Sequence, residues 1–253
     1  MSLGMSAEVT VVCSAWHRQE HLELFYRQHS HSLLAQDLDV RVVYVADGGL
    51  QLSPADDRVT VVSVERGITT AEALMVGLAL TDTEYFAALN LDDYYFTDAL
   101  AAHLDMMKAR GLDMVGGDWE IRHMPQAHTD RRCYDLSTLR PCEQWPPRPE
   151  PGQRLGSGDG MNGTFGPAPV FRTSALRKVG GYPRQFGDGS RIGTIIDFIV
   201  WDRLVRAGAR VGRLPLIAGT YYSNPATQQE FRGGDDNPVL AEHRRYEEHG
   251  ALI

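Results

Sequence analysis

The sequence predicts an α/β domain in which a mostly parallel, mixed sheet is covered by helices on both faces. Apolar segments of strand length alternate with segments whose apolar residues recur at helical spacing. The 253 residues suffice for one large core, and contents of 43% hydrophobic and 23% charged residues are ordinary for a globular protein. No internal repeat and no second core are visible in the sequence, so we expect residues 1–253 to form a single domain.

Buried strands are predicted wherever a run of apolar, often β-branched residues stops at polar ones. These runs cover residues 9–14, 40–46, 59–64, 85–89, 114–115 and 170–172. Between residues 116 and 168 the periodicity is lost, and a connection of this length inside a domain is usually functional. We expect that segment to carry a hairpin or short elements over the edge of the sheet where ligands bind.

Helices are predicted between the strands. The first presents one apolar face, formed by Leu22, Phe25, Tyr26, His29 and Leu33. Further helices are expected after residue 69, over residues 99–110 and 174–179, from 194 to 208 and near 240–248. Thr69 and Glu72 have the spacing of a capping box. Asp98 and Thr194 are the expected N-caps of two later helices.

Charge and composition exclude several classes of protein. The net charge of −8 argues against a nucleic-acid-binding surface, which would be basic. No apolar run approaches the roughly 20 residues of a membrane span, and the N-terminus lacks the pattern of a signal peptide. Three cysteines give no disulfide framework. We therefore expect a cytoplasmic protein with no transmembrane segment and no nucleic-acid partner.

Polar side chains follow three of the predicted strands, at the ends where ligands bind in open α/β sheets. Ser14 and Trp16 follow the first strand, Asp47 the second, and Asp92 with Asp93 the fourth. An aromatic ring can stack on a base, and a carboxylate can accept from a base N–H. Adjacent carboxylates repel unless a cation separates them, and Mg²⁺ or Mn²⁺ prefers such oxygen ligands. Together these groups predict a nucleotide-sugar site with a cation on the diphosphate.

Each of these groups also has a simpler interpretation. Taken alone, the Asp92–Asp93 pair is more often a polar turn that leads into a helix. Asp47, which precedes two glycines, could be an ordinary turn residue, and Trp16 could be a core aromatic. Asp197 lies three residues after Thr194 and could only complete a capping box. Loops of the Gly-x-Gly-x-x-Gly and Walker types are missing after the predicted strands, which disfavours dinucleotide and P-loop sites.

Five segments in succession resemble the family 2 glycosyltransferases, which have the GT-A fold. They are residues 11–17, 43–49, 89–93, 171–182 and 196–204. The resemblance implies a single Rossmann-like GT-A domain. Its nucleotide-sugar-binding half would span about 9–115, and its acceptor-binding half about 116–253.

The resemblance also implies roles for individual residues. Ser14 and Trp16 would meet the nucleotide base, and Asp47 would recognise that base. Asp92 and Asp93 match the metal-binding carboxylate motif, with Asp92 also on the nucleotide side. Asp197 falls at the catalytic base, with Asp188 as the next carboxylate to consider.

Several positions, His17 and Ile196 among them, depart from the family pattern. Ala46 and Asn90 replace acidic residues, and Glu72 stands where many members carry an arginine. These departures leave open a catalytically inactive relative that only binds a nucleotide or a glycan. A sugar nucleotidyltransferase is a further alternative, but it would need a Gly- and Arg/Lys-rich loop after the first strand, unlike residues 13–18.

The function expected from these residues is that of a metal-dependent, inverting, hexosyltransferase-like enzyme. Its cofactor would be Mn²⁺ or Mg²⁺, and its donor a UDP- or dTDP-sugar. The acceptor would offer a hydroxyl group on a glycan, a lipid-linked sugar or a small molecule.

Overall fold

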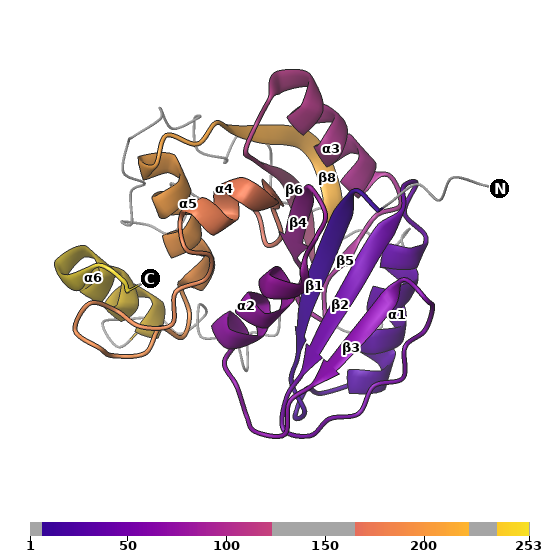
Figure 1. Cartoon of the computed structure of the whole chain (residues 1–253), viewed down its shortest axis with the longest axis horizontal. Helices are drawn as coiled ribbons and strands as arrows, with labels where there is room; N and C mark the ends of the chain where they lie inside the picture. The colour runs from indigo at the N-terminus through magenta and orange to yellow at the C-terminus, as the bar shows by residue number, and fades with distance from the viewer. Residues whose placement is uncertain (1–6, 123–164, 223–236, 253) are drawn as a thin grey trace.

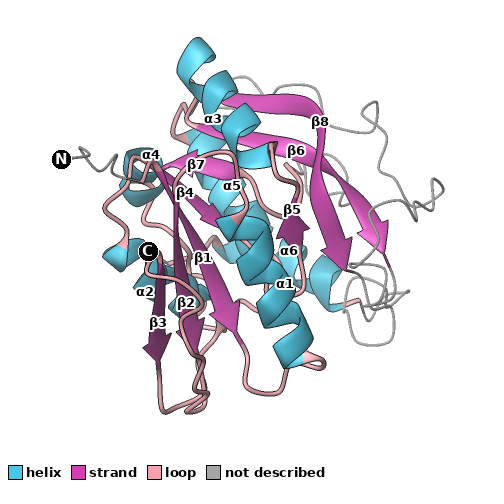
Figure 2. Ribbon diagram, turned by 90° about the vertical axis from the view of Figure 1, so that its right-hand side faces the viewer, coloured by secondary structure: helices cyan, strands magenta, loops and turns pink. Residues whose placement is uncertain are grey.

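The computed structural model describes residues 7–122, 165–222 and 237–252. Its strands are β1 (Val9–Ala15), β2 (Val40–Ala46), β3 (Val59–Ser63), β4 (Tyr85–Ala88), β5 (Tyr94–Tyr95), β6 (Met114–Arg122), β7 (Val170–Arg172) and β8 (Val211–Tyr222). Its helices are α1 (Leu22–Leu34), α2 (Thr70–Leu80), α3 (Ala99–Arg110), α4 (Thr173–Lys178), α5 (Ile196–Arg206) and α6 (Pro238–His249). The strands form one sheet in the order β3-β2-β1-β4-β7-β6-β8-β5 (Figures 1 and 2).

The sheet is mixed and mostly parallel, as predicted. Strands β1 to β4 are mutually parallel, β7 is antiparallel to both of its neighbours, and β8 runs parallel to β6. In the central pair Val12 of β1 lies opposite Ala88 of β4, and the amide of Leu89 donates to the Val12 carbonyl. This register brings the carboxyl ends of β1 and β4 to the same edge of the sheet.

Helices cover both faces of the sheet, which explains why its central strands are apolar throughout. In β1, Val11 belongs to the core beneath α1 and α3, whereas Val12 belongs to the core beneath α2 and α5. Figure 1 shows α1 and α2 on opposite sides of β1, β2 and β3. None of the helices in the described ranges is long and apolar enough to cross a membrane.

Two strands were underestimated from the sequence. We expected a strand only at residues 114–115, but β6 continues to Arg122 and pairs along its length with β8, which was not predicted. Buried Asp118 and Glu120 interrupt the apolar pattern of β6, because each has a polar partner on β8. The hairpin expected between residues 116 and 168 falls mainly on residues 123–164, which lie outside the described residues.

One predicted helix cap is confirmed in full, one is confirmed in its position only, and one is wrong. The Thr69 side chain accepts from the amide of Glu72, and the Glu72 carboxylate accepts from the amide of Thr69, which together form the capping box. Asp98 occupies the N-cap position of α3 but makes no capping hydrogen bond. The N-cap of α5 is Ile195, because the hydroxyl of Thr194 donates instead to Glu242 on α6.

The contact between α2 and β1 allows no side chain at Gly77. A Cβ atom there would lie 2.1 Å from Cγ1 of Val12, so a larger residue must push the helix away from the sheet. We expect Gly77→Val to lower the free energy of unfolding by about 1–3 kcal/mol through overpacking. Ala79→Val, on the exposed end of the same helix, is the matched control and should change it by less than about 0.5 kcal/mol. Equal values in urea unfolding would contradict this packing.

Candidate functional site

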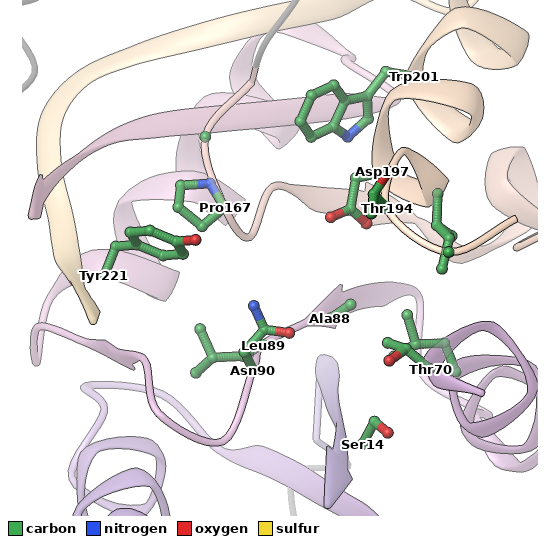
Figure 3. Close-up of a pocket in the computed structure, with 14 residues that line it drawn as sticks. Ser14, Thr70, Ala88, Leu89, Asn90, Pro167, Thr194, Asp197, Trp201 and Tyr221 are labelled. Carbon is green, nitrogen blue, oxygen red and sulfur yellow. The ribbon is translucent and has the colours of Figure 1, made fainter. Parts of the chain in front are cut away.

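A cleft opens where the carboxyl ends of β1 and β4 face the N-terminus of α5. It consists of two adjoining cavities of about 290 Å³ and 370 Å³, a size ordinary for ligand sites. Both are lined by Ser14, Thr70, Asn90 and Tyr221. Figure 3 shows the cavity of about 290 Å³, with Asp197 and Trp201 on one side and Ser14 and Asn90 across from them.

Asp197 lies in the first turn of α5 and lines the cavity of about 290 Å³. Its side chain is exposed to the cleft, and the protein atoms packed around it desolvate the carboxyl group. This desolvation raises the pKa of its carboxyl to about 6. The capping box that the sequence allowed is not formed, because Thr194 bonds to Glu242 and Ile195 is the N-cap. A structural role as a helix cap therefore does not account for Asp197.

The two carboxylates after β4 point in different directions. Asp92 lines the cavity of about 370 Å³, where burial raises its pKa to about 6 despite a hydrogen bond from Gln19. Asp93 is buried, and its Oδ1 accepts from the amide of Tyr222 at 2.8 Å. Its Oδ2 accepts from the side-chain amide of Asn90 at 3.2 Å. Of the two, Asp92 is thus the one that lines the cleft, while Asp93 ties the strand end to β8.

Asp47 lies directly after β2 and is held against the turn that follows β1. Its Oδ1 lies 2.9 Å from the amide of His17 and 2.8 Å from Nδ1 of the His17 ring. Burial alone would raise the pKa of Asp47, but hydrogen bonds from His17 and from the amide of Ile68 lower it. Gly48 permits this arrangement, because a Cβ atom there would lie 2.5 Å from the same imidazole nitrogen. The carboxylate is ionised and lies beside residues that line the cleft.

Ser14 and Trp16 both lie at the cleft, as their position after β1 predicts. Ser14 lines both cavities, and Trp16 lines the one that contains Asp92. The indole of Trp16 is 51% exposed, which is unusual for a large aromatic side chain and leaves its face open to a ligand. The alternative of a core aromatic is therefore wrong for Trp16.

Three cleft residues were missed in the sequence. Tyr221 comes from the unpredicted strand β8, and Thr70 was considered only as part of a helix. Trp201 lies one turn beyond Asp197 among the apolar residues of α5, so the sequence did not mark it as a cleft residue. Only Thr70 could have been found earlier, because it begins the helix that follows the third strand.

The described residues contain no cluster of three or more His, Cys, Asp or Glu side chains that could hold a metal ion. The fit to a divalent cation therefore rests on Asp92. Its partly desolvated carboxylate would be stabilised by a positive charge, and Mg²⁺ or Mn²⁺ commonly takes one or two carboxylates and completes its shell with water and phosphate. This side chain thus fits a cation that is shared with a diphosphate ligand.

Comparison with known proteins identifies the family. A sequence profile described as glycosyl transferase family 2 matches residues 26–180, more than half of the chain. The chain belongs to glycosyltransferase family 2. It is accordingly a glycosyltransferase by family, which confirms the class expected from the sequence. A search of curated proteins finds no match.

Solved structures show the same GT-A fold. A fragment of TarS from S. aureus aligns at 14% identity with a TM-score of 0.61, covering 95% of this chain and 72% of that one. The mannosyltransferase PcManGT from Pyrobaculum calidifontis, in complex with GDP-Man and Mn²⁺, aligns at 15% identity with a TM-score of 0.56, covering 96% and 70%. A TarS fragment in complex with UDP-GlcNAc aligns at 13% identity with a TM-score of 0.57, covering 95% and 73%. These likenesses confirm the single α/β domain of GT-A type.

The raised pKa of Asp197 predicts that its ionised form destabilises the fold. Between the ordinary pKa of 3.8 and about 6 the folded state binds more protons than the unfolded state, so stability falls as pH rises through that window. Asp197→Asn removes this cost. It should raise the free energy of unfolding at pH 7 by about 1 kcal/mol, reduced by solvent screening in the cleft, and should have no such effect below pH 4. Urea unfolding at both pH values tests this, and a variant less stable at pH 7 would contradict it.

Proposed function

We propose that the protein is an inverting glycosyltransferase that moves a sugar from a UDP- or dTDP-sugar to an acceptor hydroxyl group with the help of a divalent cation. The observation that carries this proposal is the placement of Asp92 and Asp197 in adjoining cavities that share four residues. Asp92 would lie beside the leaving diphosphate, and Asp197 would lie beside the acceptor. Family membership supports the reaction class.

The nucleotide would bind in the cavity formed after β1. Trp16 would offer its open face to the pyrimidine, Asp47 would accept from the base, and Ser14 would bond a polar group of the nucleotide. Asp92 would hold the cation on the diphosphate, with Asp93 fixing the strand end behind it. When bound, Mg²⁺ or Mn²⁺ would neutralise the charge that develops on the leaving diphosphate.

The acceptor would enter from the side of α5. Its hydroxyl oxygen forms a bond to the anomeric carbon while the bond from that carbon to the diphosphate oxygen breaks. Asp197 takes the hydroxyl proton, so one carboxylate serves as general base and the attack comes from the face opposite the leaving group. With a pKa of about 6, Asp197 is ionised at neutral pH. Its pKa is also close enough to neutral pH for the carboxylate to act as an effective base.

The metal assignment predicts different behaviour for the two neighbouring carboxylates. By calorimetry, UDP should bind wild type at least about tenfold more tightly with Mn²⁺ than with EDTA, equivalent to about 1.4 kcal/mol. Asp92→Ala should abolish that difference. Asp93→Ala should instead lower the free energy of unfolding by about 1–3 kcal/mol, because the amide of Tyr222 loses its acceptor. Equal UDP affinity in Mn²⁺ and EDTA for wild type would remove the cation from the proposal.

The proposed base predicts a loss of turnover without a loss of donor binding. Asp197→Asn should lower kcat by about 10²–10⁴-fold, since general-base catalysis typically contributes that factor. UDP affinity should stay near the wild-type value. In wild type, kcat should fall as pH drops below about 6, where the base becomes protonated.

Asp188→Asn is the matched control for this experiment. Asp188 lies 3.4 Å from the guanidinium of Arg245 and accepts from Ser190 at a turn, so the loss of its charge should leave kcat near wild type. Normal turnover in Asp197→Asn, with its fold intact, would overturn the assignment of the base. It would favour a relative that binds nucleotides without catalysis.

A further inference from the structure

The start of α5 is held by a carboxylate from a different helix. Oε1 of Glu242, on α6, accepts from the amide of Gly193 at 2.8 Å. Oε2 accepts from the amide and the hydroxyl of Thr194, each at 2.8 Å, and from the amide of Ile195 at 3.1 Å. Three successive backbone N–H groups ahead of α5 thus converge on one side chain. These amides lie at and before the N-cap Ile195, so Glu242 fixes the segment that leads into α5.

Helix α6 is itself fixed to α5 and to the loop before it. The hydroxyl of Tyr246 donates to the buried carboxylate of Asp202 at 2.7 Å, and the ring centroids of Phe198 and His243 lie 4.5 Å apart. Beyond α6, the amide of Leu252 donates to the carbonyl of Gln185 at 2.8 Å. Glu242 therefore projects from a helix that is anchored by the residues that follow it.

The residues that Glu242 holds form part of the cleft wall. Gly193 and Thr194 line the same cavity as Asp197, and Asp197 follows two residues after Ile195. A Cβ atom at Gly193 would lie 3.1 Å from Oε1 of Glu242, so the carboxylate also packs closely against this segment. A shift of the segment would move Asp197 relative to Asn90 and Ser14 across the cleft.

We propose that Glu242 is a positioning residue for the transfer reaction. By fixing the backbone from Gly193 to Ile195, it sets the position of the Asp197 carboxylate in the cleft. The inference rests on the proposed function, because it needs Asp197 to act as the base. It extends the active site to the C-terminal helix, which contributes no residue to the lining of either cavity.

Kinetics of Glu242 variants in two backgrounds test the proposal. With a UDP-sugar and Mn²⁺, Glu242→Ala should lower kcat by about 10- to 100-fold, because small misplacements of a catalytic group cost that much, while the KM for the donor stays within about twofold. Glu242→Gln keeps one acceptor oxygen and should lose less. Glu248→Ala removes a charge from the exposed end of the same helix and should leave both constants unchanged.

The decisive readout is the coupling between Glu242 and Asp197. In the Asp197→Asn background, Glu242→Ala should lower kcat by less than about twofold further, because the base it positions has already gone. The same fold loss in both backgrounds would reduce Glu242 to a structural residue and overturn the inference while the proposed function stands. Normal turnover in Asp197→Asn alone would overturn both. If Glu242→Ala does not fold, Glu242→Gln is used instead, and wild-type kcat in that variant would also overturn the inference.

Discussion

The register between β1 and β4 is the constraint on which the rest of the site depends. Because Val12 lies opposite Ala88, the two strands end together, and Ser14 comes to the same edge as Asn90 and Asp92. Both strands are buried on both faces, so a slip by one residue would exchange the residues facing the two cores. The position of the polar groups is therefore decided by apolar packing. The apolar side chains in the two cores thus fix where the polar groups of the cleft lie.

The opposite wall of the cleft is built by a different principle. Asp197 reaches the cleft from a helix start that is held by hydrogen bonds to a carboxylate on α6 rather than by a sheet register. Both Asp92 and Asp197 are desolvated, and each has a pKa raised to about 6. Under the proposed function, one of these carboxylates would bind a cation and the other a proton, and each would then be relieved of the cost of an unpaired charge. Asp93, next to Asp92 in the chain, is instead buried and accepts from the amide of Tyr222.

Much of the first half of the fold follows from local sequence, whereas the second half depends on partners distant in the chain. Strands such as residues 40–46 are apolar because both faces are buried, and that pattern is visible without a structure. Strand β8 cannot be recognised in this way, since the burial of its residues follows no regular alternation and its pairing with β6 contains register shifts. The cap expected at Thr194 was wrong for a related reason, because the hydroxyl of Thr194 donates to Glu242 on α6, 48 residues away. The roles given to Ser14, Trp16, Asp47, Asp92, Asp93 and Asp197 stay predictions, as does a cytoplasmic location.

The most direct test of the account is to locate UDP on the protein by amide hydrogen exchange in the presence of Mn²⁺. The account predicts slower exchange in peptides that contain Trp16, Thr70 and Asp92, the residues around the nucleotide cavity. Another cavity, of about 530 Å³, shares only Ile68 with the nucleotide cavity, and the peptide over residues 180–185 that lines it should show no change. Protection at that second cavity, with unchanged exchange around Asp92, would contradict the assignment of the cleft as the nucleotide-sugar site.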